Sequence, residues 1–150
     1  MTKTGITLAV ASDHGGFSMK EFIKQKLEIQ GYKVKDFGTY SEDSVDYPDF
    51  IHPLANDINK GKLEKGIIMC GSGNGAQMTA NKYPNVRAAL CWDKEQTILT
   101  RQHNNANVLS LPGRFIPFET AWEMVQLFLT TEFEGGRHAQ RINKIAQILK

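Results

Sequence analysis

Cysteine is scarce in this sequence: among 150 residues, only Cys70 and Cys91 carry a thiol. Two cysteines cannot build a disulfide framework, and no spacing of cysteine and histidine resembles a zinc site. We therefore expect no metal. Because free thiols persist in reducing compartments, the sequence predicts a cytoplasmic protein.

Long apolar runs and a strong charge are also missing. No apolar stretch approaches the roughly 20 residues that a helix needs to cross a bilayer, so we expect no membrane partner. The apolar stretch near the N-terminus lacks a preceding basic region and a following cleavage site, which indicates a buried strand and not a signal peptide. The net charge of +2 is too weak a bias to indicate a nucleic-acid partner.

The sequence does contain a regular alternation of short apolar runs and longer amphipathic runs. The short runs predict five strands, and the amphipathic runs predict helices between them. The strands are expected at 6–11, 32–38, 65–70, 87–91 and 107–111. The helices are expected at 17–31, near 51–59, at 74–84, after the cap Asp93, from Pro117, and from 137 to the C-terminus with Ile142, Ile145, Ala146 and Leu149 buried.

This alternation predicts an α/β fold. One three-layer α/β/α domain over residues 1–150 would hold a five-stranded parallel sheet, covered on both faces, with a C-terminal helix. In open sheets of this class, ligands bind outside the carboxyl ends of the strands. The loops expected at that edge are 12–16, 38–50, 70–75, 92–93 and 112–116.

A glycine-rich loop, CGSGNG at 70–75, follows the third predicted strand. One glycine suffices for a plain turn, whereas three glycines in five residues indicate that the backbone lies close against a ligand. Successive N–H groups and the N-terminus of the next helix form a nest for an anion. Cys70 adjoins this nest, which would stabilise a thiolate acting as a nucleophile or as a base.

The same loop fits the dinucleotide-binding fingerprint loosely. Gly71, Gly73 and Ala76 have the right spacing, and Asp93 follows about 20 residues later, where a ribose-binding acid would lie. The chain is too short for a full dinucleotide fold together with a substrate domain. Asp93 is explained more simply as a helix cap, and Cys91 as a small buried apolar residue.

Two further polar clusters have both a structural and a functional interpretation. Asp13 and His14 form a turn at the end of the first strand, where Asp13 could instead cap the first helix. His103 and Asn104 lie at the end of a predicted helix, a position that capping also explains. Neither cluster identifies a ligand by itself.

Paired arginines are more informative. Arg137 and Arg141 share one face of the last helix, near its start, where positive charge opposes the helix dipole. A bound dianion such as phosphate would justify that placement, and Arg114 after the fifth strand could join the pair.

Six motifs occur in order over nearly the whole chain: SDHGG, DYPDF, CGSGNG, ANKYPNVRAA, RQHNNANVL and EGGRHAQRI. Together they resemble the type B ribose-5-phosphate isomerases, whose superfamily includes the galactose-6-phosphate isomerase subunits. The resemblance implies a Rossmann-like domain, a phosphorylated sugar substrate, and interconversion of ribose 5-phosphate and ribulose 5-phosphate. It also implies a homodimer or dimer of dimers with active sites between subunits, and no metal or organic cofactor.

Residue by residue, the resemblance implies that Cys70 is the base that moves a proton between C2 and C1. It implies that His103 opens the furanose ring and that the loop with Ser72 holds the enediolate. Some members use a glutamate after the glycine loop, where this chain has Ala76 and keeps the cysteine. The implied substrate contacts, with the arginines on the phosphate, are Asp13, His14, Tyr47, Gly71, Ser72, Gly73, Asn74, Gly75, Asn104, Arg114, Arg137 and Arg141.

Three alternatives stay open at the level of the sequence. One is an isomerase of a 6-phosphohexose such as galactose or allose 6-phosphate. A second is a dinucleotide-dependent enzyme. The third is a sugar-phosphate-binding subunit without activity, against which the presence of both Cys70 and His103 argues.

Overall fold

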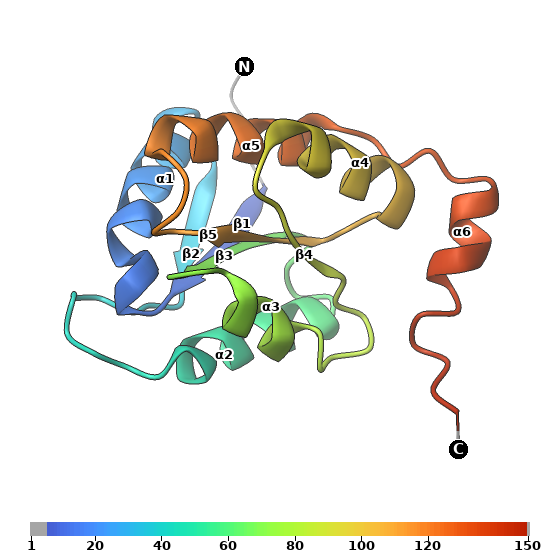
Figure 1. Cartoon of the computed structure of the whole chain (residues 1–150), viewed down its shortest axis with the longest axis horizontal. Helices are drawn as coiled ribbons and strands as arrows, with labels where there is room; N and C mark the ends of the chain where they lie inside the picture. Colours follow the sequence, from blue (N-terminus) through green and yellow to red (C-terminus); the bar gives the residue numbers. More distant parts are fainter. Residues whose placement is uncertain (1–5, 150) are drawn as a thin grey trace.

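A five-stranded parallel sheet forms the centre of the fold, as the alternation predicts. The computed structural model describes residues 6–149. The strands lie in the order β2-β1-β3-β5-β4 (Figure 1). Their bounds are Thr7–Ser12 for β1, Lys33–Asp36 for β2, Gly66–Cys70 for β3, Ala88–Leu90 for β4 and Val108–Pro112 for β5.

Helices cover both faces of this sheet, as expected (Figure 1). The helices α1, α4 and α5 lie over one face, while α2 and α3 lie over the other. Within residues 6–149, no helix has the length and the apolar character that a membrane span requires. The bounds are Phe17–Ile29 for α1, Tyr47–Asn59 for α2, Asn74–Ala80 for α3, Lys94–Asn104 for α4, Phe118–Thr130 for α5 and Arg137–Ile142 for α6.

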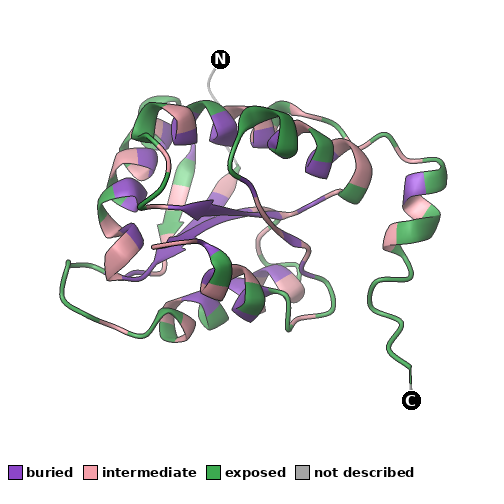
Figure 2. Ribbon diagram, viewed as in Figure 1, coloured by how far each residue is buried: buried purple, intermediate pink, exposed green. Residues whose placement is uncertain are grey.

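The central strands are apolar because both of their faces are buried. In β1, Leu8 and Val10 pack towards α1 and α5, while Ala9 and Ala11 pack towards α2. Figure 2 shows the central strands β1, β3 and β5 buried between two helical layers whose outer sides are exposed. Continuous apolar strands of this kind are typical of parallel sheets.

Local signals for helix ends are confirmed at α4. The carboxylate of Asp93 accepts a hydrogen bond from the Gln96 N–H at 2.8 Å, and the Gln96 side chain accepts one from the Trp92 N–H at 2.6 Å. The first bond satisfies an N–H group that the first turn of the helix leaves free, and the second ties the residue before the cap to that turn.

The predicted bounds of two other helices are wrong. The helix α2 begins at Tyr47 and not near residue 51, because Pro48 is tolerated in the first turn, where no N–H is needed. The helix α3 ends at Ala80, before Pro84. Its C-cap Asn81 turns the chain towards β4 through two side-chain bonds to the backbone of Ala88, at 2.8 and 2.9 Å.

The prediction of a long, buried last helix is also wrong. The helix α6 has six residues, Arg137–Ile142, and it lies beside α4 (Figure 1). Beyond it, Ile145 is 62% exposed and Leu149 is 95% exposed, with Ala146 exposed as well and Ile142 only partly buried. Short helices depend on the packing of an apolar face, and the described part of this chain does not cover that face.

A buried ion pair fastens α1 to the end of β2. The ammonium group of Lys20 is fully buried and lies 2.7 Å from the carboxylate of Asp36, which Lys24 also approaches at 3.2 Å. Burial alone would raise the pKa of Asp36, but the bonds from Lys20 and from the Gly38 N–H outweigh burial and hold that pKa below its usual value. The resulting stabilisation is present above the ordinary carboxyl pKa and is lost as pH falls through the lowered one.

We expect Lys20→Met to lower the free energy of unfolding by about 3 kcal/mol, because it leaves the Asp36 carboxylate buried without its main partner. The matched control is Lys24→Met. This lysine is partly exposed and forms the longer contact, so its loss should cost less. Denaturant unfolding at pH 7 measures both variants, and equal losses would contradict the assignment of Lys20 as the principal partner.

Candidate active site

The glycine loop is tightly organised around Cys70, the last residue of β3. The N–H of Gly73 donates a hydrogen bond to Cys70 Sγ at 3.2 Å, and a donor in this position stabilises negative charge on sulfur. Gly73 has φ +79, a left-handed conformation that glycine adopts without strain, and it caps α3. Its carbonyl accepts a bond from the buried Ser110 hydroxyl at 2.7 Å, which fixes the loop from below.

The loop after β5 closes against the glycine loop. The N–H of Gly113 donates to the Cys70 carbonyl at 2.9 Å, and the N–H of Arg114 donates to the Gly71 carbonyl at 3.0 Å. The Arg114 side chain lies over two glycines, since a methyl group on Gly71 or on Gly15 would stand 3.3 Å from its guanidinium. Three carboxyl-end loops therefore meet around one arginine.

Asp13 has the capping role that the sequence left open, although it caps the short 3-10 turn His14–Gly16 and not α1 itself. Its carboxylate accepts bonds from the N–H groups of Gly15 at 2.9 Å and Gly16 at 3.2 Å. His14 accepts a bond from the Val45 N–H at its Nδ1 atom, at 3.2 Å. His14 therefore fastens the loop that leads to α2.

Tyr47, the first residue of α2, packs against the glycine loop. A methyl group on Gly75 would collide with the Tyr47 ring and hydroxyl, so the two residues are in direct contact. Ser72 lies at the top of the loop, where its hydroxyl accepts a bond from the Asn74 N–H at 3.3 Å. The residues predicted from the first and third carboxyl-end loops, with Tyr47 and Arg114, thus form one group at that edge.

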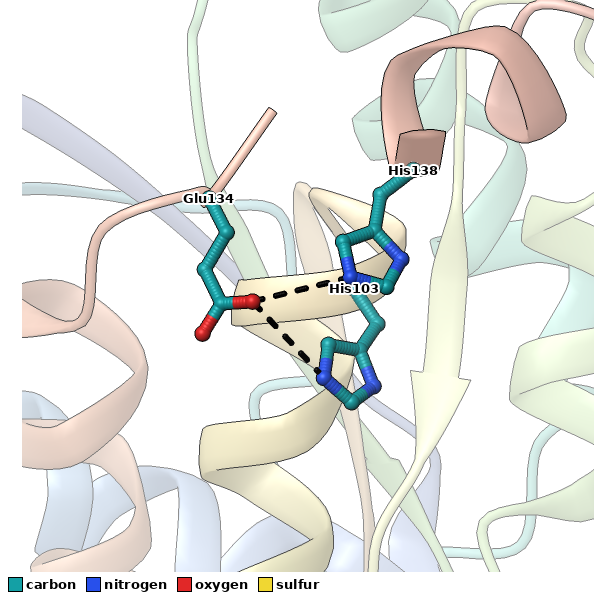
Figure 3. Close-up of side chains that lie close together, drawn as sticks. All are labelled: His103, Glu134 and His138. Carbon is teal, nitrogen blue, oxygen red and sulfur yellow. Dashed lines mark ion pairs between the residues drawn. The ribbon is translucent and has the colours of Figure 1, made fainter. Parts of the chain in front are cut away.

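A second group forms around His103, in the last turn of α4 (Figure 3). Its ring stacks on that of His138, with centroids 4.4 Å apart and an interplanar angle of 15°. A carboxylate oxygen of Glu134 lies 3.9 Å from His103 Nε2 and 3.5 Å from His138 Nε2. Glu134 and His138 are not among the site residues predicted from the sequence. Their i,i+4 spacing inside the EGGRH segment is the one local signal that pointed to them.

His138 is the buried member of the second group. Burial lowers its pKa below the ordinary value for histidine, and positive charge on His103 and Arg137 lowers it further. These effects favour the uncharged form of the His138 imidazole, against the nearby Glu134 carboxylate. Arg137 and Arg141 lie exposed on α6, one turn apart as predicted, and Asn104 is exposed at the end of α4.

The two groups lie at opposite ends of the strands, the first at the carboxyl ends and the second near the amino ends. Cys70 ends β3 and pairs with Pro112, the last residue of the parallel strand β5. His103 precedes Val108, where β5 begins. Five residues of strand span roughly 13 Å, so one chain does not bring its own Cys70 and His103 together.

Known proteins resemble this chain in both fold and sequence. A family model described as Ribose/Galactose Isomerase matches residues 8–145. The chain belongs to the ribose/galactose isomerase family. By family it is an aldose–ketose isomerase, and it is 38% identical to the ribose-5-phosphate isomerase B of Escherichia coli over 94% of this chain and 95% of that protein.

Solved structures of the ribose/galactose isomerase family agree closely with this fold. A ribose 5-phosphate isomerase from Thermotoga maritima superposes with a TM-score of 0.94 at 46% identity, covering 96% of this chain and 99% of the other. A ribose-5-phosphate isomerase B from Mycoplasma genitalium, with bound ribulose-5-phosphate, superposes with a TM-score of 0.91 at 40% identity and 95% coverage of both chains.

Proposed function

We propose that this chain interconverts ribose 5-phosphate and ribulose 5-phosphate through an enediolate, without a cofactor. The observation that carries the proposal is the hydrogen bond from the Gly73 N–H to Cys70 Sγ, at the entrance of a glycine loop in a chain of the ribose/galactose isomerase family. That bond supports a thiolate beside an anion nest, which is the pairing that this reaction needs.

Cys70 acts as the base in this proposal. Its thiolate takes the proton from C2 of the open-chain aldose and returns it to C1, while a second proton moves between the two sugar oxygens. The enediolate between these steps is stabilised by the N–H groups of the loop 71–75, because fixed donors aimed at developing charge are the strongest electrostatic device available. The free thiols of Cys70 and Cys91 support a reducing, cytoplasmic setting.

His103 opens the furanose ring by general acid–base catalysis before proton transfer at carbon begins. Arg114, Arg137 and Arg141 supply the positive charge for the phosphate, for which guanidinium groups are well suited. Asp13, His14, Tyr47 and Asn104 complete the proposed substrate contacts.

Because Cys70 and His103 lie at opposite edges of the sheet, the proposed active site requires two chains, one supplying Cys70 and the other His103. Exposed apolar side chains support such a homodimer, including Ile145 at 62% and Ile148 at 87% exposure. These side chains line a groove of about 800 Å³ beside α3, β4 and α4, together with Tyr83, Leu90 and Leu99. A second copy of the chain would cover this surface, either as a dimer or as part of a dimer of dimers.

We expect turnover of ribose 5-phosphate to exceed that of galactose or allose 6-phosphate. We also expect this turnover to survive EDTA in full, because the proposed chemistry uses only protein groups. A coupled assay of ketose formation with each sugar phosphate measures this. Strict dependence on a divalent ion or on a nicotinamide cofactor would overturn the proposal, and a preference for a 6-phosphohexose would correct the substrate.

Cys70→Ser should lower kcat by about 10²–10⁴-fold, because serine keeps an acceptor for the Gly73 N–H but is a far poorer base. Cys91→Ala is the control. Burial raises the pKa of Cys91 to about 11, so this residue remains a thiol at neutral pH and its loss should leave kcat nearly unchanged. Steady-state kinetics beside thermal melting separate catalysis from folding. Near-normal turnover by Cys70→Ser would place the base elsewhere.

Co-expression of Cys70→Ala and His103→Ala chains tests the shared site. Each variant alone should be inactive, whereas random pairing should restore about a quarter of the wild-type rate, because half of the dimers contain one intact site out of two. Pairing Cys70→Ala with Ser72→Ala is the matched control and should give no more activity than the mean of the two variants measured alone, since both changes affect the same half of the site. Absence of recovery in the first mixture, with dimers present, would refute the two-chain site.

A further inference from the structure

The geometry points to a zinc-binding site formed by His103, Glu134 and His138. One Zn²⁺ ion would bind there per chain. Because the ion would occupy an imidazole nitrogen of the residue proposed to open the sugar ring, zinc would inhibit the isomerase. The inhibitory part of this inference rests on the proposed function, whereas zinc binding itself does not.

The donor atoms already converge to nearly the spacing that zinc needs. Ligand atoms at Zn–N and Zn–O distances of about 2.0–2.2 Å stand roughly 3.4 Å apart around a tetrahedral ion. In the structure, the Glu134 oxygen lies 3.5 Å from His138 Nε2 and 3.9 Å from His103 Nε2, and the donor atoms of all three side chains lie within 4.8 Å of one another. Figure 3 shows both imidazole rings presenting a nitrogen to the same carboxylate.

The small movement that zinc binding still requires falls on the two partly exposed ligands. The His138 side chain is 10% exposed and serves as the fixed ligand, while the side chains of His103 at 40% and Glu134 at 51% exposure are free to adjust. The parallel rings must tilt to direct both lone pairs at one ion, and the more exposed His103 is the ring that can turn.

The backbone holds the three residues close together before any ion binds. The N–H of Glu134 donates to the Gln102 carbonyl at 3.1 Å, which fastens the segment after α5 to the end of α4 next to His103. Gly135 and Gly136 then adopt left-handed φ values of +71 and +57, and this reversal brings His138 back over His103. The site is therefore largely preformed.

The donor set selects the metal. Two imidazole nitrogens and one carboxylate suit zinc and its neighbours in the transition series, whereas magnesium and calcium prefer oxygen ligands throughout. Three protein ligands leave a fourth position on zinc for water or for a sugar oxygen. The bound ion would hold the lone pair of His103 Nε2, so this nitrogen could no longer accept a proton.

Calorimetric titration of the EDTA-treated, full-length chain with ZnCl₂ tests the site directly. The wild-type chain should bind one ion per chain, and Glu134→Gln and His138→Gln should each weaken binding by at least about tenfold. Glu132→Gln is the matched control, because this exposed acid lies in the same segment and removes the same charge. Absence of zinc binding by the wild type, or equal affinity in all four proteins, would overturn the site.

Two further measurements separate the possible failures. Thermal melting shows whether His138→Gln, a change at a buried residue, disturbs folding. If folding is disturbed, the zinc affinity of Glu134→Gln decides the test, because this change lies at an exposed residue. Isomerase assays then compare zinc inhibition with the zinc-free rate of each protein. Inhibition should be reversed by EDTA and should need about tenfold more zinc in Glu134→Gln. Zinc binding without inhibition would refute the inhibitory role, whereas zinc binding by a chain without isomerase activity would refute only the proposed function.

Discussion

The parallel direction of all five strands determines where every functional group of this protein can lie. Parallel strands all have their carboxyl ends on one side of the sheet and their amino ends on the other. Each crossover helix returns the chain to the side of the amino ends. Asp13, Cys70 and Arg114 follow strand ends and therefore meet. His103 ends a crossover helix and therefore lies at the opposite edge. The division of the candidate site into two halves is a direct consequence of this topology.

At the carboxyl edge, the same hydrogen bonds serve both the fold and the proposed chemistry. The bonds from Gly113 and Arg114 to the glycine loop hold β3 and β5 together beyond their last paired residues. They also place a guanidinium over Gly71 and Gly15, where an added methyl group would stand in tight contact with it. The rigidity that stabilises this edge is therefore the preorganisation that anion binding requires.

The opposite edge has a different character. The histidine pair, Glu134 and the two arginines of α6 are held by short segments, and the apolar tail beyond Ile142 is exposed. This is the surface that the proposed homodimer would cover. The proposed zinc site of His103, Glu134 and His138 lies on this same surface.

Local pattern determined much of this protein. The strands, the cap at Asp93 and the glycine loop after β3 follow from short-range periodicity and from backbone freedom, and the motifs also indicated the family. Tertiary structure decided the rest. The apolar periodicity after Arg137 predicts a buried helix, yet within residues 6–149 no surface covers Ile145, Ile148 and Leu149. Similarly, 30 residues or more of sequence separate His103 from Glu134 and His138. Only the path of the backbone after α5 brings these residues into contact, because packing and not sequence spacing determines which distant residues meet.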